Sequence, residues 1–202
     1  MTERLYKVLN AQGQPIHGTG TWNLPTDDEP GAWMPEIKGA LAPCENGYHL
    51  CRPQDLLHWL NAQIYTVEYR GERVDDDNKV VVRQARLLKR LSAWDERTAR
   101  LFACDCADRV LPFFENRVPG DARPRQAIAT AQQFADGKAT KKELAAAADA
   151  AWDAAGATAW AAAGAAAGDA AGAAAWAAAW AAAWDAEREW QTERLMRYLG
   201  EV

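Results

Sequence analysis

Tryptophan or glycine occupies every fourth position from Trp152 to Trp184, nine positions in all, and nearly every residue between them is alanine. Alanine is the strongest helix former, so this repeat predicts helix. An unbroken helix over the repeat would be about 50 Å long, which is long for a chain of this size. We therefore expect a break near Gly156 or near Gly168, where a following threonine or aspartate can cap a new helix.

The glycines in the middle of the repeat leave a groove that another helix or a large ring can approach closely. The indoles that follow can fill such a groove, each burying on the order of 150–250 Å². These indoles are Trp176, Trp180 and Trp184. We interpret the repeat as a helix-packing device, within one chain or across a homodimer. The alternative is a row of exposed indoles that binds a partner. Stacking of these indoles on nucleic acid is the least favoured form of this alternative.

The charge of the chain argues against two classes of partner. The net charge is −5, whereas a nucleic-acid binder usually carries a clustered basic face. Aspartates interrupt the alanine-rich stretch, and one at the centre of a membrane-spanning helix costs about 2.5–3.5 kcal/mol. The N-terminal residues lack the apolar run of a signal peptide. We therefore predict a soluble, cytoplasmic protein with reduced cysteines that binds neither nucleic acid nor membranes.

The first 91 residues predict short strands joined by turns. Alternating β-forming residues at 64–69 and the strand at 79–83 flank a charged turn, so they predict a hairpin. Residues 6–9 predict a further strand, and residues 41–44 a short edge strand, because Pro43 cannot donate to a ladder.

Two more segments complete the N-terminal half. Residues 53–60 predict a short helix that Pro53 opens. Residues 18–40 are dense in glycine, proline and aspartate, so they predict a loop, anchored by Trp22 and Trp33.

Composition changes near residue 91, and three helices are predicted beyond it. They cover residues 93–115, residues 122–135 and a segment that starts near residue 140. Pro112 is expected to kink or interrupt the first helix, and Asp121 to cap the second. The sequence thus predicts an α+β protein, with a small mixed sheet module at 1–91 followed by an Ala/Trp-rich helical bundle at 92–202.

The four cysteines and His49 suggest a zinc site, but their spacing fits poorly. Structural zinc sites usually pair ligands two to four positions apart, and six residues separate Cys44 from Cys51. Cys104 and Cys106 would lie about 200° apart around a helix. We predict no metal ion and no cofactor.

His49 has two interpretations. It is an acid–base or ligand-binding group, or it hydrogen-bonds a turn, which we favour. No nucleophile–base pair is local enough in the sequence to indicate catalysis, and no phosphate-binding glycine motif is present. A second hypothesis is that a small ligand binds in a pocket between the two modules. Its lining would be Trp22, Trp33, Tyr48, His49 and Arg70.

Arg123 and Arg125 form a compact cationic turn at the start of a predicted helix. Cations there oppose the helix dipole, so we expect these arginines to pair with carboxylates elsewhere. Asp105 and Asp108 on the preceding helix are the expected partners, in a buried pair that joins the two helices. Binding of an anion or of a partner protein is the alternative.

Two motifs follow one another in the C-terminal half. Residues 103–115 read ACDCADRVLPFFE, residues 121–128 read DARPRQAI, and an alanine-rich tail follows. In this order they resemble the immunity-protein-five-like family of bacterial immunity proteins. The resemblance implies an all-helical domain that neutralises a partner by binding it. The relatives tend to carry histidine and arginine among the tail alanines, where this chain has tryptophan, so no metal or proton role at those positions carries over.

The N-terminal half carries a second set of short motifs. They are YKVL at 6–9, GYHLC at 47–51, VEYRGE at 67–72 and KVV at 79–81. Together they resemble an uncharacterised module of phage and bacterial proteins that often precedes repetitive C-terminal segments. This resemblance implies no reaction.

The sequence therefore favours an immunity or counter-defence protein, phage or bacterial, that acts by binding a protein partner without catalysis. The tryptophan-bearing helices, or the loop around Tyr48 and His49, would supply the contacts. The alternative is a small-ligand-binding protein or enzyme with a pocket around His49.

Overall fold

The computed structural model describes residues 3–18, 20–166 and 172–201, with side chains outside 154–184. The chain forms two compact units, one of Met1–Asp95 with Arg188–Val202 and one of Glu96–Glu187. A four-stranded antiparallel sheet in the N-terminal half is followed by helices, which confirms the α+β prediction. None of the helices in the described part has the length and apolar character that crossing a bilayer requires.

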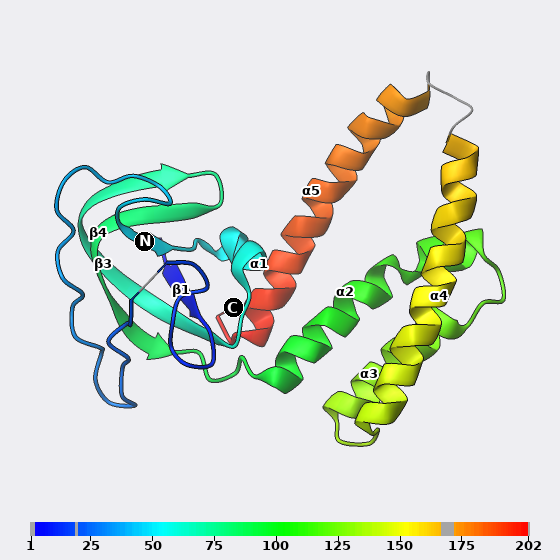
Figure 1. The fold of residues 1–202 in the computed structure, drawn as a ribbon, viewed down its shortest axis with the longest axis horizontal. Helices are drawn as coiled ribbons and strands as arrows, with labels where there is room; N and C mark the ends of the chain where they lie inside the picture. The colour runs from blue at the N-terminus through cyan, green and yellow to red at the C-terminus, as the bar shows by residue number, and fades with distance from the viewer. Residues whose placement is uncertain (1–2, 19, 167–171, 202) are drawn as a thin grey trace. The chain divides into compact units, whose positions relative to one another are not determined.

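The sheet has the strand order β1-β3-β4-β2 and curls until its two edges meet. Its strands are β1 (Leu5–Leu9), β2 (Tyr48–Leu50), β3 (Gln63–Asp76) and β4 (Lys79–Arg90), and Figure 1 shows the long β3–β4 hairpin. Irregularities after Thr66 and after Arg70 bend the hairpin, as β-bulges do. Tyr6 on the first edge and Cys51 beside the other exchange two backbone hydrogen bonds of 2.8 Å. The curled sheet thus encloses an interior.

That interior is the core of the N-terminal unit. Apolar side chains from all four strands and from the loop before β2 fill it, and they are Leu5, Leu9, Trp22, Leu50, Tyr65, Val67, Val80, Val82, Ala85 and Leu87. Because successive side chains of a strand point to opposite faces, residue 7 of β1 lies in the same row as Leu5 and Leu9.

The predicted hairpin and short helix are confirmed. The hairpin is longer than expected, and it carries charged cross-strand pairs, for example Arg86 with Glu68 at 2.6 Å. The helix comprises η1 (Pro53–Asp55) and α1 (Leu56–Trp59). The predicted edge strand at 41–44 is wrong, because Cys44 has a φ of 65°, outside the extended region, and only an isolated bridge forms there.

The loop at 18–40 is confirmed over its described residues, and its anchors differ in kind. Trp22 is buried in the core, whereas the ring of Trp33 lies close to two guanidinium groups. The distances from its centroid are 4.3 Å to Arg70 and 4.8 Å to Arg86. Gly31 donates its backbone N–H to Leu87 O at 2.9 Å, and any Cβ there would lie 2.0 Å from a backbone oxygen. This close approach requires glycine.

The C-terminal end of α5 (Gly172–Tyr198) belongs to the N-terminal unit, although the sequence groups it with the helical half. Figure 1 shows these last turns beside α1. Leu195 and Leu199 are buried, at 0% and 3% exposure. The hydroxyl of Tyr6 donates to Glu201 at 2.9 Å. Apolar burial and a hydrogen bond therefore hold the end of the chain against β1.

The described part of the second unit holds three whole helices and the first part of α5. The three whole helices are α2 (Glu96–Arg117), α3 (Arg123–Ala135) and α4 (Lys141–Ala166), at the predicted positions. Pro112 does not interrupt α2, which continues to Arg117. Nor does α4 break at Gly156, and the other expected break, at Gly168, lies outside the described residues.

Candidate functional site

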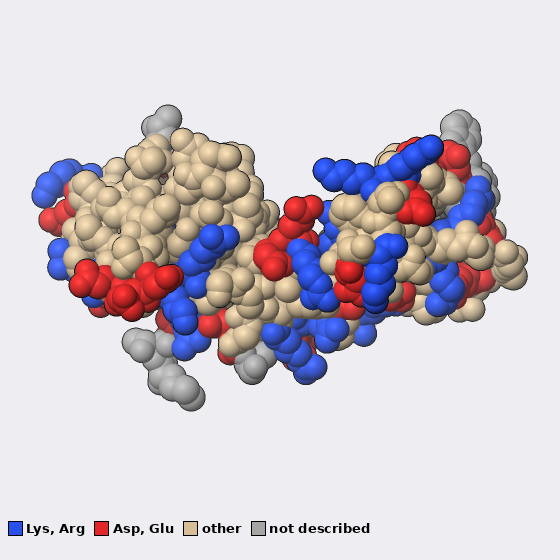
Figure 2. All heavy atoms as spheres, turned by 90° about the horizontal axis from the view of Figure 1, so that it is seen from below, with Lys and Arg blue, Asp and Glu red and all other residues tan. Residues whose placement is uncertain are grey.

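A cavity of about 970 Å³ opens within the N-terminal unit. Its described lining is formed by residues 15–18, 20–23 and 44–51, together with Lys7, Val8, Met34, Pro35, Ile37, Trp59 and Lys79. Among its described lining residues only Lys7, Glu45 and Lys79 carry charge. Figure 2 shows a broad face of this unit that is largely uncharged, with basic and acidic side chains gathered toward its rim.

Lys7 places an ammonium group where the strand pattern predicts an apolar side chain. Its Nζ donates to the backbone oxygen of His49 at 3.0 Å and lies 5.1 Å from the centroid of the Trp22 ring. Burial lowers its pKa from 10.5 to about 8. Among the described residues no carboxylate forms an ion pair with it, so the charge is held by one carbonyl and one aromatic face.

His49 lies on β2 and hydrogen-bonds the turn before it, as the favoured interpretation predicts. Its Nε2 accepts the backbone N–H of Cys44 at 2.8 Å. Burial lowers the pKa of His49, and the ammonium groups of Lys7 and Lys79 lower it further. The imidazole is therefore neutral near pH 7, and an accepting Nε2 assigns its proton to Nδ1.

The aromatic wall of the cavity is fixed by two contacts. The rings of Trp22 and Tyr48 meet edge to face, with centroids 5.4 Å apart. The hydroxyl of Tyr48 donates to Pro35 O at 2.7 Å, which ties β2 to the loop before it. Edge-to-face pairs of this kind stabilise by about 0.5–1.5 kcal/mol beyond the area that they bury.

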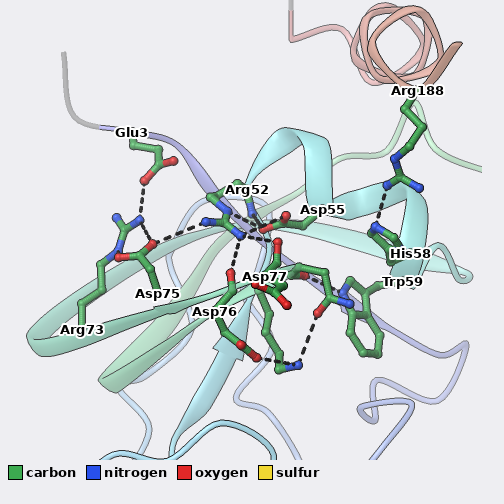
Figure 3. A network of polar contacts seen from close by, with 12 residues as sticks. Glu3, Arg52, Asp55, His58, Trp59, Arg73, Asp75, Asp76, Asp77 and Arg188 are labelled. Carbon is green, nitrogen blue, oxygen red and sulfur yellow. Dashed lines mark hydrogen bonds and ion pairs between the residues drawn. The ribbon is translucent and has the colours of Figure 1, made fainter. Parts of the chain in front are cut away.

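A polar network next to the cavity holds the β3–β4 turn (Figure 3). Arg52 Nε donates to the Asp55 carboxylate at 2.7 Å, and its guanidinium also donates to Asp76 O at 2.7 Å and to Asp77 O at 3.1 Å. The Asp55 side chain is only 3% exposed. One arginine thus neutralises a buried carboxylate and satisfies two carbonyls of the turn.

The same turn positions Lys79 at the cavity. Its Nζ lies 3.0 Å from the Asp76 carboxylate, which raises the pKa of Lys79, and 5.7 Å from the centroid of the Trp59 ring. The indole N–H of Trp59 donates to Asn78 O at 2.9 Å.

The structure brings together only some of the predicted site residues. Trp22, Tyr48 and His49 line one cavity, and all the lining residues belong to the N-terminal unit. Trp33 and Arg70 do not line it, because they stack on each other and Arg70 also donates to Gln84 at 2.7 Å. The sequence analysis missed Lys7 and Lys79. The available signal for Lys7 was a lysine between the apolar residues of a strand.

The predicted partners of the cationic turn are wrong. Arg123 pairs with Asp121 at 2.6 Å, and Arg125 pairs with Glu115 at 2.7 Å. Both arginine side chains are well exposed, at 45% and 59%. The pairs form at the surface because Asp121 is two residues away and Glu115 lies near the end of α2, so neither pair has to be buried.

Two aromatic side chains of the helical unit are mostly exposed. Phe113 on α2 is 77% exposed and Trp152 on α4 is 80% exposed. The side chains of Trp176, Trp180 and Trp184, which were predicted to bind or pack, lie outside the described residues.

The four cysteines differ in burial. Cys51 and Cys104 are buried, whereas Cys44 is exposed. No group of three or more potential ligands gathers in the part of the chain that the structure describes. Burial raises the pKa of the Cys51 thiol to about 12, which keeps it protonated and unreactive.

Comparison with known proteins identifies the helical part of the chain. Residues 89–184 match the family model described as Imm-5 like putative immunity protein. The C-terminal half carries an Imm-5-like domain. This confirms the resemblance inferred from the sequence, and the domain is of the immunity type. In the Imm-5-like domain the first motif lies on α2 and the second at the start of α3. Searches among curated proteins and solved structures found no significant match.

Proposed function

We propose that this protein confers immunity by binding a toxic protein partner, without catalysis. The match of residues 89–184 to an immunity family supports the type of function. The observation that supports binding is the exposure of Phe113 and Trp152 within that domain, at 77% and 80%. Aromatic side chains dominate the energetics of protein interfaces because each buries a large area on binding.

Two ion pairs on the described surface of the domain are compatible with this role. Arg123 and Arg125 are already paired with Asp121 and Glu115, so they offer nearly neutral, hydrogen-bonded groups rather than free charges. Polar groups of this kind typically form the rim of an interface, around an apolar centre. In this proposal Phe113 and Trp152 are the anchors, and the arginine pairs contribute specificity.

Capture of the partner tests the proposal. The full chain, tagged and expressed in the cells that naturally encode it, is purified and analysed by native mass spectrometry. We expect one stoichiometric protein partner. The double variant Phe113→Ser/Trp152→Ser should lower its recovery at least tenfold. Leu24→Ser, at a 48% exposed position of the other unit, is the matched control and should not.

Protection then distinguishes immunity from other binding, and binding from catalysis. The partner expressed alone should stop growth, and co-expression of this protein should restore it. A protein that acts by occupancy protects only at roughly equimolar amounts, whereas an enzyme protects when far scarcer than its target. A harmless partner, or protection at a small fraction of equimolar, would overturn the proposal.

A further inference from the structure

Lys7 has no opposite charge beside it among the described residues. The residue lies in the row of Leu5 and Leu9, which are 1% and 0% exposed, yet it carries an ammonium group. An ammonium has three hydrogens to donate, and only the bond to His49 O is formed among the described residues. Buried charges are normally paired, because removing an ion from water is costly unless an opposite charge replaces the water.

The cavity supplies room for that opposite charge. Lys7 lines it, and the described lining is largely uncharged and includes the aromatic rings of Trp22, Tyr48 and Trp59. Lys79 adds a second ammonium, already neutralised by Asp76 at 3.0 Å. A space of about 970 Å³ accommodates a small organic molecule, since ligand sites commonly span about 300–1,000 Å³.

These features select the class of ligand. An anionic group would pair with Lys7, and a flat apolar body would contact the aromatic rings. A neutral ligand would leave Lys7 uncompensated. A polyphosphate would carry several charges to a site where Glu45 also lines the wall and Lys79 is already paired.

We propose that the cavity of the N-terminal unit binds a small aromatic monoanion, a carboxylate or sulfonate, whose charged group pairs with Lys7 and whose ring packs on Trp22 and Tyr48. This site is independent of the partner-binding surface proposed for the helical domain. Lys7 provides selectivity for the anion, and the aromatic wall provides affinity for the ring.

A matched pair of fluorescent probes tests this on the full chain. 8-Anilinonaphthalene-1-sulfonate carries the anionic group, and N-phenyl-1-naphthylamine has the same ring system without it. We expect the protein to bind the sulfonate, and benzoate to displace it. Lys7→Met should weaken sulfonate binding at least tenfold and change binding of the neutral probe less than twofold. Lys38→Met, at a lysine whose side chain is 86% exposed, should change neither.

A second variant keeps the test valid if Lys7→Met does not fold. Ile16 lines the cavity and is 40% exposed, so a polar side chain is tolerated there. Ile16→Glu should weaken sulfonate binding severalfold relative to Ile16→Gln and leave the neutral probe unaffected. The proposal is overturned if the wild-type protein does not bind the sulfonate. It is also overturned if these variants affect both probes alike, or neither.

Discussion

Leu195 provides a direct test of the assignment of the C-terminal segment to the N-terminal unit. The side chain is 0% exposed, so Leu195→Ala leaves a cavity where the isopropyl group was. Substitutions of this kind cost about 2–5 kcal/mol, the transfer energy of the lost carbons plus the energy of the cavity. Because about 1.4 kcal/mol corresponds to a factor of ten, the unfolded fraction of the unit should rise by roughly 30-fold or more.

Amide hydrogen exchange, followed by mass spectrometry over β1, β3 and β4, measures this free energy within one unit. The exchange of the slowest amides in these strands should speed up by the same factor in Leu195→Ala. Leu24→Ala is the matched control, because Leu24 is 48% exposed and surface changes usually stay within about 0.5 kcal/mol. If the strand amides exchange equally fast in the two variants, the C-terminal segment does not stabilise this unit and the reasoning is refuted.

Two further substitutions test the polar groups. The pKa of Lys7 is about 8 in the folded chain and 10.5 in the unfolded chain. Between these pH values the unfolded state binds more protons, so the stability of the wild type rises with pH. The free energy of unfolding in urea should therefore be ~3 kcal/mol higher for Lys7→Met than for the wild type below pH 8, and the difference should vanish by pH 10.5. A difference that does not change with pH would contradict this. Arg52→Met should cost about 3–5 kcal/mol in urea unfolding, because it leaves the Asp55 carboxylate buried and unpaired. A cost no larger than that of Lys38→Met would show that Arg52 does not hold this turn.

Local signals in the sequence predicted most of the elements. The β-forming residues at 64–69 and 79–83 gave the hairpin, because strand periodicity and turn composition are properties of neighbouring residues. The three helices before residue 167 followed in the same way from apolar spacing, capping residues and alanine content. The two family motifs were also recognisable, since each is a short contiguous segment.

The candidate site depended on contacts that no local pattern encodes. Tyr48, His49 and Trp22 were identified as site residues and do line one cavity, but Trp33 and Arg70 were grouped with them only because their side chains suit binding. The contact of Trp33 with two arginines of the hairpin depends on how the loop crosses β3 and β4. That path is set by long-range backbone hydrogen bonds such as Gly31 to Leu87.

The sequence by itself determined most of the secondary structure, the α+β class and the immunity-type domain, because each of these is encoded by residues close together in the chain. Tertiary structure alone decided that Lys7 faces a cavity and that Leu195 packs with the N-terminal unit. Both depend on the closure of the sheet between Tyr6 and Cys51 and on the burial of the chain's end against it. Such contacts join residues far apart in sequence, and the free energy that selects them comes from burying apolar surface in three dimensions, which periodicity does not record.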